Sequence, residues 1–135
     1  MTLIYRTDLI GVDWVALKTT LRSDQFDNGR TADQLQRSLQ NSYGVCIAWA
    51  DDLVVGTGRV LSDGVGNAYM IDVWTLSRFR RQGIATRMIG SLCSNLSGQH
   101  VYLQADGEAQ TLYRRLDFSE QPVGMGRVIG RYLQG

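Results

Sequence analysis

The stretch Arg80–Ala85 has the sequence Arg-Arg-Gln-Gly-Ile-Ala and joins an apolar, strand-like run to an amphipathic, helix-like one. The first backbone N–H groups of a helix have no partners within the helix and carry a partial positive charge. A phosphate placed there meets hydrogen-bond donors and a favourable field. Gly83 and Ala85 have no side chain bulky enough to keep it from the backbone. The stretch therefore predicts an anion-binding turn.

The spacing in this turn excludes a Walker loop, which needs two glycines and Lys-Ser/Thr, and also the dinucleotide pattern Gly-x-Gly-x-x-Gly. Arg80, Gly83 and Ala85 instead form Arg-x-x-Gly-x-Ala. This resembles the coenzyme A signature Gln/Arg-x-x-Gly-x-Gly/Ala of the GNAT superfamily of N-acetyltransferases. Without its surroundings, the turn fits equally well a basic surface loop with solvated arginines. The resemblance implies that the turn binds the pyrophosphate of acetyl-CoA through Arg80, Arg81, Gln82, Gly83, Ile84, Ala85 and Thr86.

Local signals around this turn predict the elements that position it. Asp13 is expected to cap a helix, and Thr31 with Gln34 has the pattern of a capping box at the start of another. Alternation and helical spacing predict the remaining elements. In chain order, we expect strand 2–7, helices from 14 and from 31, strands 43–50, 53–61 and 68–76, a helix after Gly83, strand 100–105, helix 108–116 and strand 125–133.

A second block, from Asp106 to Phe118, is similar to the family pattern Asn-x-x-Ala-x-x-Leu-Tyr-x-x-x-Gly-Phe. Asp106 and Asp117 depart from it, standing where the family has Asn and Gly. We expect Asp117 to end its helix in a left-handed or turn conformation, and we do not assign Asp106 as a coenzyme ligand, since an ionised carboxylate only accepts hydrogen bonds. The two blocks and the order of elements together resemble the GNAT fold.

The resemblance implies an α/β (α+β) fold over residues 1–135 as a single domain. Its mixed central sheet is expected to have about six to seven strands, with helices on both faces and a splay between the fourth and fifth strands. The family binds the pantetheine arm of acetyl-CoA in this splay. Here Val73, Trp74 and Thr75 would lie along the arm, and a backbone N–H there could polarise the thioester carbonyl.

Acetyl transfer to an amine also needs a proton for the departing thiolate. Tyr113 holds the Leu-Tyr position of the family, which implies the role of general acid, and a phenol with a pKa of about 10 can protonate a thiolate with a pKa of about 8.5. The alternative is an aromatic residue packed on a helix face.

Asp72 is the one charged residue within the apolar run 68–76, and a desolvated carboxylate there could act as the base that deprotonates the amine. Three alternatives remain open. Asp72 could be hydrogen-bonded at a strand bulge, or it could recognise the charge of an incoming amine. Direct attack, with solvent taking the proton, needs no base at all.

The polar stretch from Arg22 to Arg30 is the candidate acceptor loop. Phe26, with Asp24 or Asp27, would suit an amine that has an apolar body. The alternative is a mobile polar loop without a ligand.

Composition limits the other classes of function. The chain has 135 residues, 44% of them hydrophobic, and a net charge of +1, which does not favour nucleic-acid binding. No signal peptide or membrane span is apparent, which predicts a cytoplasmic protein that does not bind membranes. The Cys46 and Cys93 thiols and the single His100 do not suggest a metal site, and both cysteines are expected to be buried apolar residues.

The sequence thus predicts an acyltransferase, an acetyl-CoA-dependent N-acetyltransferase that acetylates a primary amine of a small molecule or protein by direct attack in a ternary complex. A homodimer is compatible with this prediction. The alternative class is a non-catalytic acetyl-CoA-binding sensor or interaction module of the same fold. An acetyltransferase acting on aminoacyl-tRNA would need a more basic surface.

Overall fold

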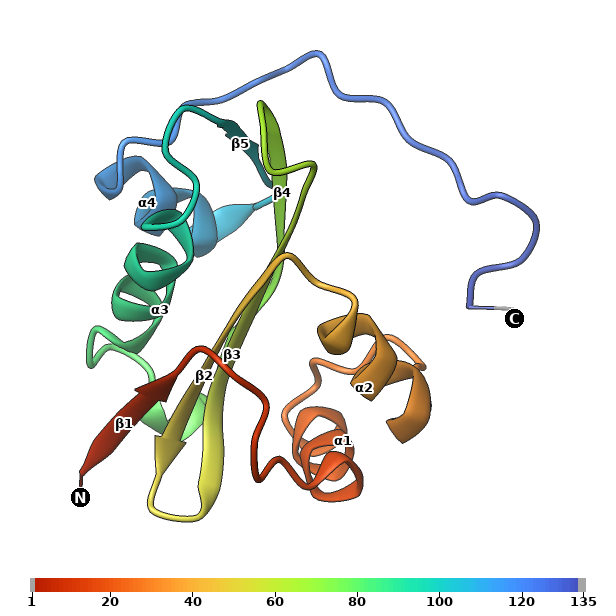
Figure 1. Ribbon diagram of the computed structural model, residues 1–135, viewed down its shortest axis with the longest axis vertical. Helices are drawn as coiled ribbons and strands as arrows, with labels where there is room; N and C mark the ends of the chain where they lie inside the picture. Colours follow the sequence, from red (N-terminus) through yellow and green to blue (C-terminus); the bar gives the residue numbers. More distant parts are fainter. Residues whose placement is uncertain (1, 134–135) are drawn as a thin grey trace. The chain divides into compact units, whose positions relative to one another are not determined.

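The computed structural model describes residues 2–133, and the chain divides into two compact units at residues 104 and 105. The first unit is built on a five-stranded sheet with the order β1-β2-β3-β4-β5 (Figure 1). Neighbouring strands of the sheet are antiparallel, except β4 and β5, which are parallel. The strands are β1 (Leu3–Arg6), β2 (Gly44–Ala50), β3 (Leu53–Ser62), β4 (Asn67–Thr75) and β5 (His100–Tyr102).

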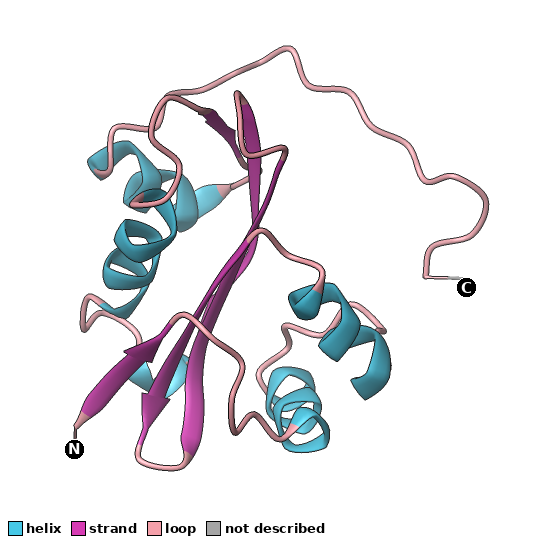
Figure 2. Cartoon of the chain, viewed as in Figure 1, coloured by secondary structure: helices cyan, strands magenta, loops and turns pink. Residues whose placement is uncertain are grey.

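Helices cover both faces of this sheet, as predicted. The helices α1 (Trp14–Ser23) and α2 (Ala32–Gln40) lie on one face, and α3 (Ile84–Cys93) lies on the other (Figure 2). A short 3-10 helix, η1 (Ser77–Phe79), joins β4 to the turn before α3. Each of these helices buries one apolar face. In α3 this face consists of Ile84, Met88, Ile89 and Leu92.

The predicted starts of the first two helices are confirmed. Asp13 accepts a hydrogen bond from the Ala16 N–H at 3.0 Å at the start of α1. At the start of α2, Thr31 and Gln34 form the complete capping box, with distances of 3.1 and 2.9 Å. These caps satisfy backbone donors that would otherwise lack a partner.

The splay between the fourth and fifth strands is present. β4 pairs with β5 only from Asn67 to Tyr69, whereas β4 continues to Thr75. β5 ends at Tyr102, three residues before the predicted end of this strand. The edge of β4 from Met70 onward is therefore not covered by β5.

The second unit contains one helix, α4 (Gly107–Arg115), close to the predicted helix 108–116. The predicted strand at 125–133 is wrong, because the structure shows no strand there, and the sheet of the described chain has five strands rather than six or seven. Met125 is fully exposed and Ile129 is 74% exposed. Glycines at 124, 126 and 130 also weaken any extended ladder, because glycine has no side chain to pack.

The cysteine prediction is half correct. Cys46 is fully buried in β2, whereas Cys93, at the end of α3, is only half-buried. Burial raises the pKa of both thiols, although a hydrogen bond from Ser91 and the charge of Arg87 oppose the shift at Cys46. Within residues 2–133, no helix is long and apolar enough to cross a membrane.

Candidate active site

A β-bulge interrupts β4 at Asp72. Thr57 pairs with Trp74 and Arg59 pairs with Ile71, so Gly58 of β3 faces two residues of β4. Asp72 has a φ of 57°, which is left-handed and uncommon for a residue other than glycine. The Thr57 hydroxyl, in a buried residue, donates to the Asp72 carbonyl at 3.1 Å and holds the bulge. The sequence alternative of a hydrogen-bonded Asp72 at a bulge is confirmed.

The bulge is followed by the uncovered edge of β4. The Leu76 N–H donates to the Val55 carbonyl of β3 at 2.8 Å. Because successive residues of a strand direct their backbone groups to opposite edges, the N–H and carbonyl of Thr75 face the edge away from β3. Arg80 Nε donates to that Thr75 carbonyl at 3.1 Å, while the Thr75 N–H faces the same edge. This edge can therefore offer a backbone donor to an extended ligand.

The predicted anion-binding turn is exposed and has left-handed backbone at two positions. Gly83 has a φ of 80° and Arg81 a φ of 63°, and a Cβ added at Gly83 would meet nothing within 4 Å. No side chain caps α3, and the Arg87 N–H makes the bond back to the Gly83 carbonyl at 3.1 Å. The backbone N–H groups of residues 84–86 lie in the first turn of α3, where they have no acceptor within the helix. The turn thus meets the requirements of an anion site.

The arginines around the turn have different surroundings. Arg80 Nη2 lies 3.6 Å from Asp24 Oδ2, so this guanidinium contacts protein acceptors as well as solvent. Arg78 lies over the ring of Phe79, and Arg87 lies 4.8 Å from the ring centroid of Tyr5. Arg81 and Thr86 are exposed beside Gly83. The phosphate-binding roles of the turn residues stay predictions, and Arg81 has the side chain that is freest to fulfil one.

The candidate acceptor loop is fixed along β4. Trp74 Nε1 donates to Asp24 Oδ2 at 2.9 Å, and the Ser77 N–H donates to the same oxygen at 3.1 Å. The ring of Phe26 lies 6.5 Å from that of Trp74. Burial alone would raise the pKa of Asp24, but hydrogen bonds from Ser77 and Trp74, with Arg80 nearby, lower it below its usual value. These contacts hold this end of the loop against β4, and its role as an acceptor site stays a prediction.

The other end of this loop is anchored by charge. Arg30 is 6% exposed, and its Nη1 donates to Asp72 Oδ2 at 2.9 Å. Arg59 Nε of β3 donates to the same oxygen at 2.7 Å. Arg30 also donates to Asn28 and to the Ser38 hydroxyl of α2. We call Arg30, Arg59 and Asp72 the arginine cluster. Catalysis by Asp72 stays a prediction, and its ion pairs favour a positioning role.

Tyr113 lies in the second unit, on α4, and is 8% exposed. Its ring meets that of Phe118 edge-on, with 5.5 Å between centroids. The left-handed conformation predicted for Asp117 is confirmed by its φ of 68°. Asp106 precedes α4 without capping it through its side chain. The general-acid role of Tyr113 stays a prediction.

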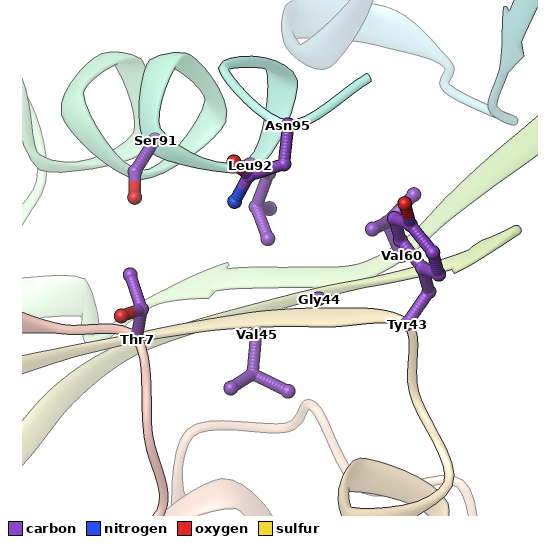
Figure 3. A pocket seen from close by; sticks show the side chains of 8 residues that line it. All are labelled: Thr7, Tyr43, Gly44, Val45, Val60, Ser91, Leu92 and Asn95. Carbon is purple, nitrogen blue, oxygen red and sulfur yellow. The ribbon is translucent and has the colours of Figure 1, made fainter. Parts of the chain in front are cut away.

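A small cavity of about 150 Å³ lies in the first unit, away from the turn. Figure 3 shows Ser91, Leu92 and Asn95, from α3 and the segment after it, facing the strands that carry Gly44 and Val60. Ligand pockets for drug-sized molecules occupy about 300–1,000 Å³, so this cavity is too small for a coenzyme. Among the described residues, no group of three His, Cys, Asp or Glu could hold a metal ion.

Sequence reasoning missed Arg30 and Arg59. A signal was present for Arg59, because it is a lone charge in the apolar strand next to the one that contains Asp72. Opposite charges on neighbouring strands commonly pair. No comparable pattern marks Arg30, which reaches Asp72 across 42 positions of the chain.

Known proteins share this architecture. A probable acetyltransferase from methicillin-resistant Staphylococcus aureus is 18% identical, with 97% of this chain and 100% of that chain covered and a TM-score of 0.81. A GNAT family acetyltransferase from Streptococcus pneumoniae is 21% identical, with 96% and 100% covered and a TM-score of 0.79. A predicted acetyltransferase from Clostridium acetobutylicum, solved with acetyl-CoA, is 18% identical, with 94% of this chain and 96% of that chain covered and a TM-score of 0.71.

Among curated proteins, no sequence matches this chain. The model of the acetyltransferase (GNAT) family, by contrast, matches residues 12–118, which include the bulge, the turn and the block that contains Tyr113. The strand order, the uncovered edge of β4 and the glycine turn before α3 agree with that match. The chain therefore belongs to the GNAT family of acetyltransferases, which are acyltransferases that use acetyl-CoA.

Proposed function

We propose that this protein transfers the acetyl group of acetyl-CoA to a primary amine, by direct attack of the amine in a ternary complex. The observation that carries the proposal is the succession of an uncovered β4 edge and an uncapped α3 that begins after a left-handed glycine, Gly83. One feature suits an extended amide chain, and the other suits a pyrophosphate. Acetyl-CoA combines the two.

The residues of the turn would hold the donor at its phosphates. Backbone N–H groups of the first turn of α3 would donate to the pyrophosphate, with Gly83 allowing close approach. Arg81, Gln82 and Thr86 are exposed there and can add side-chain donors. The pantetheine arm would then follow the edge of β4 at Val73, Trp74 and Thr75.

The chain needs to supply little to the reaction beyond binding and proton transfer. As the amine nitrogen bonds to the acetyl carbon, the carbon–sulfur bond breaks, and a backbone N–H on the β4 edge stabilises the negative charge on the oxygen. The Tyr113 hydroxyl would give its proton to the departing thiolate, and the amine proton passes to solvent. The family motif, rather than a contact in the structure, supports this role of Tyr113.

The experiment is a two-step measurement on the full chain. Calorimetry measures acetyl-CoA binding, and a thiol-release assay with pooled primary amines measures turnover. We expect binding and amine-dependent release of free thiol. Absence of binding at high acetyl-CoA concentration would contradict the proposal, and binding without turnover of any amine would support a sensor instead.

A further inference from the structure

The arginine cluster contains more positive than negative charge. Arg30 and Arg59 both donate to one oxygen of Asp72, so two guanidinium groups share a single carboxylate. Among the described residues, the other side chains that contact the cluster are neutral: Asn28, Ser38, Ser42 and Thr57. The cluster therefore has one surplus positive charge in a largely buried position. Such a charge is costly unless an anion or water compensates it.

Each guanidinium in the cluster also has an unused donor group. Hydrogen bonds engage Nε and Nη1 of Arg30 and of Arg59, but within the described residues none engages Nη2 of either. The side chains are only 7% and 11% exposed. Within the described residues, the side-chain nitrogen and oxygen atoms that are both fully buried and without a hydrogen-bond partner are Trp49 Nε1 and Thr75 Oγ1. The two Nη2 groups have no partner in this part of the chain but are not among these atoms, so both remain accessible to solvent. Because both guanidiniums contact Asp72 Oδ2, they lie side by side.

The arginine cluster lies next in sequence to both the predicted path of the acetyl group and the candidate acceptor loop. Asp72 immediately precedes Val73, where the predicted path of the acetyl-bearing arm begins, and Arg30 ends the acceptor loop. The acidic residues of that loop are already engaged: Asp24 with Trp74, Ser77 and Arg80, and Asp27 with Lys18 at 2.6 Å. Both carboxylates of the loop, which the sequence suggested as partners for an amine, thus already have partners within the protein. The surplus charge beside it suits an anion.

We propose that the acceptor is an amine with an anionic group, a carboxylate or a phosphate, and that this group binds the Nη2 donors of Arg30 and Arg59. This inference rests on the proposed acetyl transfer. Guanidinium groups match both anions in geometry, and charge-assisted hydrogen bonds of this kind are stronger than neutral ones. The distance between the amine and the anionic group would set which acidic amine is used.

Matched pairs of amines test the inference on the unmodified protein. Phosphoethanolamine is compared with ethanolamine, and β-alanine with β-alaninamide, by kcat/KM in the thiol-release assay at equal acetyl-CoA. We expect the anionic member of at least one pair to have a kcat/KM at least about tenfold higher, since a charge-assisted hydrogen bond contributes about 1.5–3 kcal/mol. The pair that responds identifies phosphate or carboxylate as the preferred group.

Variants locate the effect. R59Q and R30Q should remove the preference for the anionic amine, whereas R37Q, at an exposed arginine of α2, should keep it. Since R30Q removes a buried ion-pair partner, thermal unfolding is measured alongside, and R59Q is sufficient if R30Q does not fold. Calorimetry with phosphoethanolamine and β-alanine gives a second readout, in which binding of at least one is lost in R59Q and kept in R37Q.

Two different failures can be told apart. If the protein does not bind acetyl-CoA, the proposed function is wrong. If it binds acetyl-CoA and acetylates neutral amines as well as or better than their anionic partners, only this inference is overturned. A preference for anionic amines that survives in both R59Q and R30Q also overturns it, and so does a lack of both binding and turnover of the anionic amines.

Discussion

Asp24 and Trp74, fifty positions apart, are joined by a hydrogen bond of 2.9 Å from the indole N–H to the carboxylate. Trp74 is 2% exposed and belongs to β4, while Asp24 directly follows α1. The same carboxylate accepts from the Ser77 N–H and lies 3.6 Å from Arg80 Nη2. Asp24 therefore connects the candidate acceptor loop, the end of β4 and the start of the predicted anion-binding turn. If the proposed donor and acceptor sites are correct, Asp24 positions them relative to each other.

The first prediction concerns D24A. It leaves the buried indole N–H of Trp74 and the N–H of Ser77 without their acceptor, so we expect the free energy of unfolding to fall by about 2 kcal/mol. Urea unfolding measures it, with D52A, at an exposed turn carboxylate, as the control. If D24A and D52A unfold alike, Asp24 does not hold the loop. The KM for acetyl-CoA should also rise in D24A, because Arg80 loses its ion pair.

The second prediction is the pH dependence of this contact. The pKa of Asp24 is lowered in the folded protein, because the hydrogen bonds from Ser77 and Trp74 and the charge of Arg80 outweigh burial. Its contribution to stability is therefore present above about pH 3.9, the pKa of an unfolded Asp, and is lost as the pH falls through the lower folded value. The difference in unfolding free energy between wild type and D24A should shrink below about pH 4. A difference that is constant from pH 7 to pH 2 would contradict this assignment.

Local signals made much of this fold predictable. The cap at Asp13, the capping box at Thr31 and the turn at Gly83 depend on residues within a few positions of each other, and their chemistry is visible in the sequence. The strand predicted at 125–133 shows the limit of such signals. Alternating apolar residues specify a strand only where a neighbouring strand pairs with it, and none does so in the described chain.

The contacts of the candidate acceptor loop could not be predicted in the same way. Asp24 with Trp74, and Arg30 with Asp72, join segments that are far apart in the sequence and meet only after the loop folds along β4. The sequence marked Asp72 as an unusual buried charge and left several roles open. The structure supplied its partners, Arg30 and Arg59, and these are the basis of the proposal that the acceptor has an anionic group.

The third prediction compares alanine substitutions of two glycines, Gly83 just before α3 and Gly90 within it. G83A forces a left-handed φ of 80° on alanine without any steric contact, so the cost is backbone strain of about 1 kcal/mol. G90A lies inside the helix in open space and should stabilise the protein by about 0.5–1 kcal/mol. The KM for acetyl-CoA should rise in G83A only. Equal values of KM in both variants would argue against phosphate binding at this turn.

The fourth prediction separates two roles of Asp72. D72N keeps the shape of the side chain but leaves Arg30 and Arg59 without the negative charge that they share. We expect the free energy of unfolding to fall by about 2 kcal/mol, which is less than the loss for a fully buried ion pair. If Asp72 is a positioning residue, D72N should lower kcat/KM but keep the acidic limb of the pH–rate profile. Disappearance of that limb in D72N, but not in D52N, would instead identify Asp72 as the general base.

The fifth prediction is that Y113F reduces kcat by about 100-fold, the effect typical of losing a general acid. The phenylalanine ring keeps the edge-on contact with Phe118, so the Kd for acetyl-CoA should not change, and thermal unfolding checks that Y113F is folded. Y102F is the control, because Tyr102 is 40% exposed and stacks on His100, outside the proposed chemistry. If kcat is the same in Y113F as in the wild type, the thiolate takes its proton from another donor, and Tyr113 serves only to pack α4. If instead kcat falls and an acyl donor with a more acidic leaving thiol restores it, protonation of that thiol is the step that Tyr113 assists, because such a leaving group needs less help from an acid.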